Sequence, residues 1–320
     1  MLKYLIVPLT KDAVSFCHYE RSDDKSTVFD IPTLKKAIFF AMTENLNIQF
    51  LYPDYTISDE HKKIIDSIDH TSIVSSTCED KQLTDNADVI VFDSWAVLIH
   101  YDFQKDKSYI IRSDKKHFFD NARFLNGILK KVDRIVVVIT DPDNFSNEDF
   151  DLYAKILESL IPVIREEYKK GHMVHFNLLT DRIFLDSMNN CNAGYESITL
   201  APDGNFYICP AFYLDGSDSV GDLDNGLNIK NSQLYRLDHA PICRICDAYQ
   251  CRRCVWLNKQ ITLETNTPSR QQCVMAHIER NTSRSLLSLI REAGSFMMGK
   301  EISEIDYIDP FDVIIRNENK

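Results

Sequence analysis

The sequence predicts an α/β domain, followed by a small irregular domain rich in cysteine and by a C-terminal helix. Short apolar runs alternate with amphipathic segments over the first half of the chain. From about residue 185 the helical periodicity stops, and turns and cysteines dominate. A last helical segment begins near residue 274 and precedes an acidic and apolar tail. We therefore expect three parts, at residues 1–184, 185–280 and 281–320.

Six segments of the first domain are short, rich in β-branched residues and bounded by polar or turn residues, which is typical of β-strands. They are KYLIVPL (3–9), NIQFLYP (47–53), ADVIVFD (87–93), SYIIRS (108–113), DRIVVVIT (133–140) and HMVHFNLLT (172–180). The segment TSIVSS (71–76) is a weaker candidate for a further strand.

Amphipathic segments between these strands carry apolar residues at helical spacing. They are IPTLKKAIFFAMTENL (31–46), SDEHKKIIDSI (58–68) and SNEDFDLYAKILESLIPVIREEYKKG (146–171). We expect Pro162 to kink the third segment or to split it in two. Repeated strand–helix alternation implies parallel strands joined by right-handed crossovers. A partial or degenerate (β/α) barrel and an open doubly wound sheet both satisfy this pattern.

The composition limits the partners of the chain. The 320 residues carry a formal net charge of −12, and 44% of them are hydrophobic. This composition is that of a globular protein, and the acidic surplus argues against a nucleic-acid partner. No run approaches the ~18 apolar residues of a membrane span, and the first residues lack a signal-peptide pattern. We therefore expect a cytoplasmic protein with reduced thiols and without a membrane partner.

Seven of the nine cysteines fall in the second domain. Four of them form the run CRICDAYQCRRC (243–254), with the spacing C-x2-C-x4-C-x2-C. The other three are Cys191, Cys209 and Cys273. The segment ESITLAPDGNFYICP (196–210) alternates apolar residues on both sides of Gly204, which predicts a β-hairpin with a tight turn.

Three kinds of chemistry compete to explain these thiols. Disulfides are disfavoured by the odd number of cysteines and by the reducing compartment. Two C-x2-C knuckles on one zinc are usually separated by ~15–20 residues, which is far more than the spacing here. Closely spaced thiolates on a loop, completed by distant ones, suit an iron–sulfur cluster. The spacing therefore favours iron–sulfur ligation and leaves zinc as the alternative.

The seven cysteines and Gly204 resemble the SPASM domain, the auxiliary-cluster module of radical SAM peptide-modifying enzymes. That family has the pattern C-x9–15-G-x4-C, then C-x2-C-x5-C-x3-C, then a last cysteine. In this chain each of the last two spacers of the middle element is one residue shorter. The resemblance covers about residues 185–280.

The resemblance implies two [4Fe–4S] clusters with interleaved ligands. One cluster would be held completely by Cys243, Cys246, Cys251 and Cys273. The other cluster would receive three ligands, from Cys191, Cys209 and Cys254. Seven thiolates cannot close two four-iron sites, so one iron would be open or have another kind of ligand. The candidates for that ligand are His172, His175 and Asp186, although the simplest interpretation of each is structural.

Radical SAM enzymes also carry a C-x3-C-x2-C signature after the first barrel strand, and this chain lacks it. Residues 1–190 contain Cys17 and Cys78 alone, which we expect to be ordinary buried side chains. This combination resembles the pseudo-radical-SAM proteins of peptide maturation, and most closely the CXXX repeat peptide maturases. The resemblance implies a degenerate barrel that does not cleave S-adenosylmethionine, a precursor peptide with cysteine repeats, and a radical SAM partner protein.

Two functions follow from these patterns. The first is an iron–sulfur accessory protein or maturase in the modification of a ribosomally made, cysteine-rich precursor peptide. The alternative is a zinc-stabilised scaffold that binds the peptide without a redox or catalytic role. No Ser-His-Asp, HExxH or paired-carboxylate signature indicates another class of enzyme. We expect the tail EISEIDYIDPFD (301–312) to pack onto the parent domain.

Overall fold

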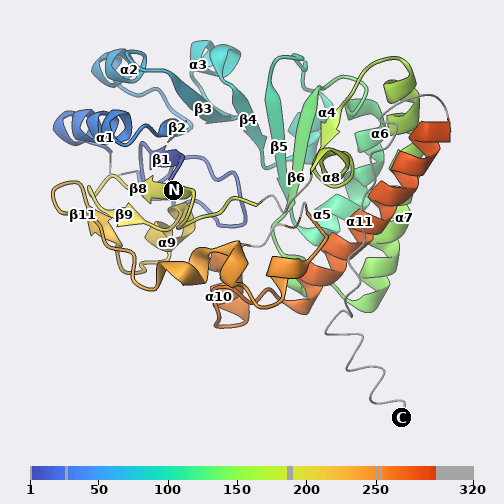
Figure 1. Cartoon of the computed structure of the whole chain (residues 1–320). Helices are drawn as coiled ribbons and strands as arrows, with labels where there is room; N and C mark the ends of the chain where they lie inside the picture. Colours follow the sequence, from blue (N-terminus) through green and yellow to red (C-terminus); the bar gives the residue numbers. More distant parts are fainter. Residues whose placement is uncertain (1, 26–27, 186–189, 250, 252–253, 293–320) are drawn as a thin grey trace.

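The computed structural model describes residues 2–25, 28–185, 190–249, 251 and 254–292 (Figure 1). The candidate ligand Asp186 and the acidic tail at 301–312 lie outside the described residues.

Nine strands form one sheet in the order β7-β6-β5-β4-β3-β2-β1-β8-β9. The pairs from β7 to β8 are parallel, and β8 with β9 is antiparallel. The strands are β1 (Tyr4–Pro8), β2 (Asn47–Leu51), β3 (His70–Ser75), β4 (Val89–Phe92), β5 (Ser108–Ser113), β6 (Arg134–Ile139), β7 (His175–Phe176), β8 (Ser197–Leu200) and β9 (Phe206–Tyr207). A separate two-stranded ribbon contains β10 (Gly221–Asp222) and β11 (Gly226–Leu227).

The strand order decides between the two architectures that the sequence allows. A doubly wound sheet reverses its order at a switch point, whereas β1 to β7 follow one another across this sheet. β8 then pairs with β1, as it would in a closed eight-stranded barrel. Because β7 and β8 lie apart in the sheet order, the barrel is open between them. The expected partial (β/α) barrel is therefore confirmed.

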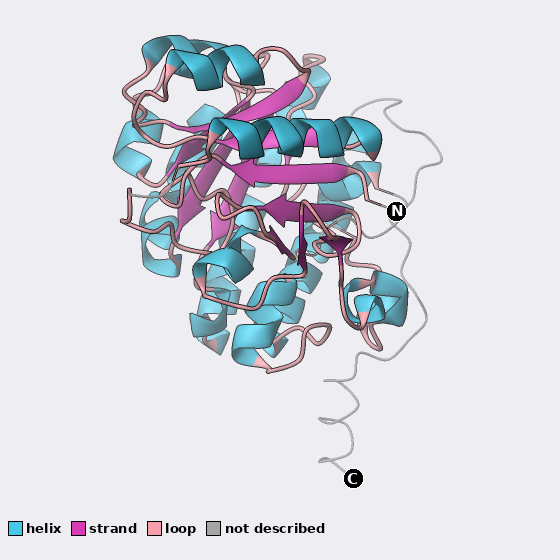
Figure 2. Ribbon diagram, turned by 90° about the vertical axis from the view of Figure 1, so that its left-hand side faces the viewer, coloured by secondary structure: helices cyan, strands magenta, loops and turns pink. Residues whose placement is uncertain are grey.

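Helices connect the strands and surround the curved sheet (Figure 2). They are α1 (Ile31–Thr43), α2 (Asp59–Ile65), α3 (Lys81–Asn86), α4 (Trp95–Ile99), α5 (Lys115–Asn121), α6 (Leu125–Ile128), α7 (Asn147–Lys169), α8 (Asp181–Phe184), α9 (Pro210–Leu214), α10 (Val255–Ile261) and α11 (Arg270–Glu292). Ser58 and Ser146 cap α2 and α7 by accepting hydrogen bonds from backbone N–H groups of the first turn. Within the described residues, no helix has both the length and the apolar character that crossing a membrane requires.

Of the two outcomes expected for Pro162, a kink or a split of the helix, the split does not occur. The helix runs without a break from Asn147 to Lys169. Leu160, Ile161 and Ile164 on either side of the proline are buried in the core, and this burial holds the segment together. Pro162 itself is exposed, so water can bind the backbone carbonyl that the proline leaves without a donor.

The two faces of the sheet bury different partners because side chains alternate along each strand. Leu5 and Val7 of β1 belong to the large core shared with the helices. Ile6 points to the opposite, inner face, where it packs with Leu51 and Ala13 in a second apolar cluster. The inner face is thus covered by the segment that follows β1.

The cysteine-rich domain is joined to the barrel at two places. The predicted hairpin is confirmed as β8 and β9, and its Gly204 has a positive φ of 80° that the turn requires. α11 packs beside α7 (Figure 1), and the Tyr153 hydroxyl of α7 donates a 2.6 Å hydrogen bond to the Glu279 carboxylate of α11. Ser283 of α11 also donates to the backbone carbonyl of Leu179 at 2.8 Å.

Replacing Leu286 tests the packing of α11. This side chain is fully buried, so Leu286→Ala should lower the free energy of unfolding by about 2–5 kcal/mol through lost apolar contact and a cavity. Ser288 is exposed on the same helix, and Ser288→Ala should change the stability by less than about 0.5 kcal/mol. Urea unfolding followed by circular dichroism measures both, and equal midpoints would contradict the described packing.

Candidate metal centres

Residues 9–20, which follow β1, fold back across the inner face of the sheet. The Leu9 amide donates to the Leu51 carbonyl at 3.0 Å, and the Val14 amide donates to the Tyr52 carbonyl at 2.9 Å. Val14 is fully buried against the inner apolar cluster, and Phe16 packs beside it. This segment therefore occupies the interior of the open barrel and carries Cys17 with it.

Arg112 holds this segment in place. Its side chain points from β5 to the inner face and is only 5% exposed. Nε donates to the Cys17 carbonyl at 2.8 Å, and Nη2 donates to the Tyr19 carbonyl at 2.7 Å. Two carboxylates balance the buried charge, Asp93 at 2.6 Å and Glu20 at 2.9 Å. Because a guanidinium donates in a rigid fork, these bonds define the position of Cys17 relative to the sheet.

Four cysteines of the C-terminal half lie together, and we name them the first thiol group: Cys243, Cys246, Cys251 and Cys273. Cys243 begins a single 3₁₀ turn, and Cys273 lies in the first turns of α11. Burial raises the pKa of the Cys251 thiol well above its usual value, and the neighbouring charges of Cys273, Cys243 and Cys246 raise it further. These electrostatic effects place the four thiols in one neighbourhood of the cysteine-rich domain.

A second set of four cysteines lines one cavity of about 360 Å³, and we name it the second thiol group: Cys17, Cys191, Cys209 and Cys254. Cys209 follows β9 and precedes α9, whereas Cys254 precedes α10 and accepts from the Leu257 amide at 3.5 Å. Burial raises the pKa of the Cys209 thiol, and Cys191 and Cys17 add to this effect. The structure therefore brings together the three cysteines that the sequence groups, and it adds a fourth.

The expectation that Cys17 is an ordinary buried side chain is wrong. Cys17 is half-buried and lines the cavity of the second thiol group. A hydrogen bond with Cys17 is the largest cause of the raised pKa of Cys254. Cys78 does behave as expected, because it is 1% exposed and its sulfur lies 3.7 Å from the Pro53 carbonyl. In the sequence, the feature that could have pointed to a role of Cys17 in the site is its position in the loop that follows the first strand.

The two histidine candidates make contacts typical of structural residues. Nδ1 of His172 lies 3.1 Å from the Glu167 carboxylate, and Nε2 lies 3.1 Å from that of Asp133. The ring of His175 packs against Phe184, with 5.2 Å between the ring centroids. Neither histidine is among the described residues that line the cavity of the second thiol group.

A buried cation beside the first thiol group fits an anionic cofactor there. Arg182 is 2% exposed, and its guanidinium stacks on the Tyr249 ring at 4.3 Å. None of its three side-chain nitrogens has a hydrogen-bond partner in the part of the chain that the structure describes. Burial is the main cause that lowers the pKa of this guanidinium, and the charges of Asp247 and, to a smaller extent, Cys246 act in the opposite direction. A buried cation with unmet donors is costly, and the sulfurs of a negatively charged iron–sulfur cluster would supply acceptors.

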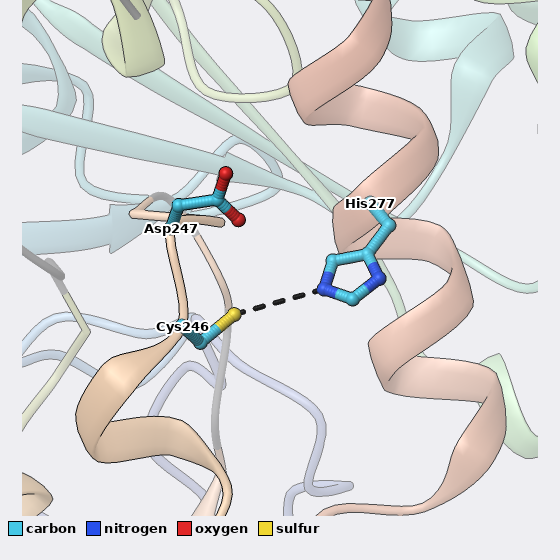
Figure 3. A group of neighbouring side chains, drawn as sticks. All are labelled: Cys246, Asp247 and His277. Carbon is cyan, nitrogen blue, oxygen red and sulfur yellow. Dashed lines mark hydrogen bonds between the residues drawn. The ribbon is translucent and has the colours of Figure 1, made fainter. Parts of the chain in front are cut away.

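Cys246 also belongs to a tighter group of possible metal ligands, with Asp247 and His277 (Figure 3). Their ligand atoms all lie within 4.8 Å of one another, and the Cys246 sulfur is 3.7 Å from Nε2 of His277. Asp247 is 1% exposed, and one of its oxygens accepts a 2.5 Å hydrogen bond from Arg280. These three side chains could hold one metal ion, although one oxygen of the Asp247 carboxylate already accepts a hydrogen bond from Arg280.

Replacing Arg112 tests how the segment over the inner face is held. Arg112→Leu should lower the free energy of unfolding by roughly 3 kcal/mol, because two backbone carbonyls lose charged donors inside the barrel. Arg21 provides the control, since its 2.8 Å ion pair with Asp54 is partly exposed. Arg21→Leu should cost less than about 1 kcal/mol. Urea unfolding measures both variants, and an equally small loss for Arg112→Leu would contradict this role.

Comparison with known proteins supports the fold. No protein-family model matches the chain, and no curated protein matches it. Among solved structures it is similar to native anSMEcpe with bound AdoMet, with a TM-score of 0.58 and 13% identity over 92% of this chain and 99% of that chain. The structure of anSMEcpe with AdoMet and Cp18Cys peptide gives a TM-score of 0.56 and 13% identity over 91% and 99%. At this identity the likeness concerns the fold alone, and it agrees with the partial (β/α) barrel described above.

Proposed function

We propose that this chain is an iron–sulfur protein that acts in the modification of a ribosomally made, cysteine-rich precursor peptide. The observation that carries the proposal is the convergence of the cysteines into two thiol groups. The first thiol group would hold one [4Fe–4S] cluster, and Cys191, Cys209 and Cys254 would bind the other. Bound clusters would supply electron-transfer or Lewis-acid chemistry that protein side chains lack.

Size and charge support clusters over single ions. A cavity of about 360 Å³ is more than ten times the ~30 Å³ share of one water, so the second thiol group has room for a polynuclear cofactor. The unmet guanidinium donors of Arg182 beside the first thiol group favour a cofactor that is negatively charged and accepts hydrogen bonds. The Asp247 carboxylate is the largest opposite charge near this guanidinium, and a bound cluster would add the hydrogen-bond acceptors that its nitrogens lack.

The inner face of the barrel favours an accessory role. Ala13 and Val14 pack on the strands there, and Arg112 ties the same segment to β5. The segment after β1 thus fills the interior, and it lacks the C-x3-C-x2-C signature. We infer that S-adenosylmethionine is cleaved by a radical SAM partner protein, and that this chain serves as its partner on the same peptide.

A peptide substrate is supported by the shared fold and by access to the second thiol group. One structure of similar fold, anSMEcpe, holds a Cp18Cys peptide. In this chain Cys191 is exposed at the edge of the cavity, so a peptide can approach from solvent. Trp256 also lines the cavity and is half-buried, which offers an apolar surface for peptide side chains.

The alternative is a zinc-stabilised scaffold that binds the peptide. It is favoured by the close approach of Cys246, Asp247 and His277, which are ligand types that zinc accepts. Oδ2 of Asp247 is buried and has no hydrogen-bond partner among the described residues, so it could face an ion. Metal content separates this alternative from the iron–sulfur proposal.

Metal and sulfide analysis of anaerobically purified protein tests the proposal. We expect about eight irons and about eight sulfides per chain, because two [4Fe–4S] clusters are proposed, together with the broad visible absorbance of such clusters. Removal of iron with a chelator should also lower the thermal stability, since metal-binding energy contributes to folding. Stoichiometric zinc without iron, under strict anaerobiosis, would favour the scaffold instead.

Replacing one ligand of the first thiol group separates a redox role from a scaffold role. Cys251→Ala should lower the iron content to about four per chain, because one cluster loses a thiolate at a buried site. Cys78→Ala is the matched control and should keep all the iron, as Cys78 lies apart from both thiol groups. If the Cys251 variant stays folded and binds the peptide while maturation stops, the scaffold role is rejected. Unchanged maturation with half the iron would contradict a role for this cluster.

A further inference from the structure

The nine cysteines of the chain divide into two groups of four and one remainder. The first thiol group contains four, the cavity of the second thiol group is lined by four, and Cys78 lies alone. Two four-iron clusters need eight thiolates when each iron has one protein ligand. The seven cysteines of the C-terminal half fall one short of this number, and Cys17 supplies the difference.

The position of Cys17 is determined by contacts outside the cysteine-rich domain. Arg112 binds the Cys17 carbonyl at 2.8 Å and the Tyr19 carbonyl at 2.7 Å, so the backbone on both sides of His18 is fixed. Phe16 packs on the inner apolar cluster just before it. The Cys17 side chain is therefore presented to the cavity by a rigid backbone, as a ligand that is in place before the metal binds should be.

Cys17 lies in the same surroundings as the other three cysteines of the second thiol group. The cavity that it shares with Cys191, Cys209 and Cys254 is bounded on one side by the sheet and on the other by the starts of α9 and α10. Tyr19, which follows Cys17 by two residues, also lines this cavity. Cys78, in contrast, faces the backbone carbonyl of Pro53 inside the core.

We propose that the Cys17 thiolate is the fourth protein ligand of the second [4Fe–4S] cluster, beside Cys191, Cys209 and Cys254. This inference rests on the proposed function, because it requires that the second thiol group binds a cluster. Each iron of that cluster then has its own thiolate, and no iron is left open for a thiol of the peptide. The cluster also ties the segment over the inner face of the barrel to the cysteine-rich domain.

The test compares anaerobically reconstituted Cys17→Ala and Cys78→Ala proteins with the unmodified full-length chain. The unmodified chain and Cys78→Ala should each hold about eight irons. After mild oxidation with ferricyanide, Cys17→Ala should hold about seven irons and show the EPR signal of a [3Fe–4S] cluster, or should hold about four irons if the whole second cluster is lost.

Two outcomes would overturn the inference. One leaves the proposed iron–sulfur function intact, whereas the other rejects that function as well. If Cys17→Ala keeps about eight irons with an unchanged EPR spectrum, Cys17 is not a ligand and the iron–sulfur function stands. If the unmodified chain itself binds no iron, the proposed function fails together with the inference.

A measurement on the unmodified chain does not depend on the folding of a variant. Alkylation followed by peptide mass spectrometry compares the reaction of each cysteine before and after reconstitution. Cys17 is half-buried, so we expect it to be alkylated in the apoprotein and protected in the reconstituted protein, as Cys191 should be. Buried Cys78 should stay unreactive in both. Equal alkylation of Cys17 in the two forms would overturn the inference.

Discussion

The parallel pairing of β1 with both β2 and β8 is the constraint on which the rest of the structure depends. It places the first strand of the barrel next to the hairpin that begins the cysteine-rich domain. Residues 9–20 then fold back over the inner face of the sheet instead of leaving it. Two parts of the chain that are distant in sequence therefore border the same cavity, and cysteines from both parts line it.

Two buried arginines, Arg112 and Arg182, differ in how many of their side-chain donors have hydrogen-bond partners. Arg112 is satisfied by two carbonyls and two carboxylates, so its burial costs little and it organises the barrel interior. Arg182 is equally buried, but its donors have no partner in the described part of the chain. The Asp247 carboxylate is near Arg182, but the guanidinium donors still lack acceptors among the described residues. This unmet hydrogen bonding is the observation that supports the cluster proposed for the first thiol group.

Much of the fold could be predicted because local patterns report local geometry. The strand-like segments before residue 185 all contain a strand of the sheet, including the weaker candidate that became β3. The amphipathic segment 58–68 contains helix α2, as its apolar spacing predicts. Pro162 does not split its helix, because burial of the neighbouring residues outweighs the loss of one backbone hydrogen bond. The choice between a barrel and a doubly wound sheet was undecided for a different reason, as both have the same local alternation and differ only in strand order.

The candidate site divides in the same way. By itself the sequence determined the seven clustered thiols and the hairpin that carries Cys209, and the resemblance to the SPASM domain implied the division of the thiols into four and three. Only the tertiary structure decided that Cys17 joins them and that the histidines His172 and His175 do not. No spacing relates Cys17 to the other cysteines, because long-range strand pairing and the Arg112 hydrogen bonds bring it there. Periodicity records neighbours along the chain, whereas a metal site collects neighbours in space.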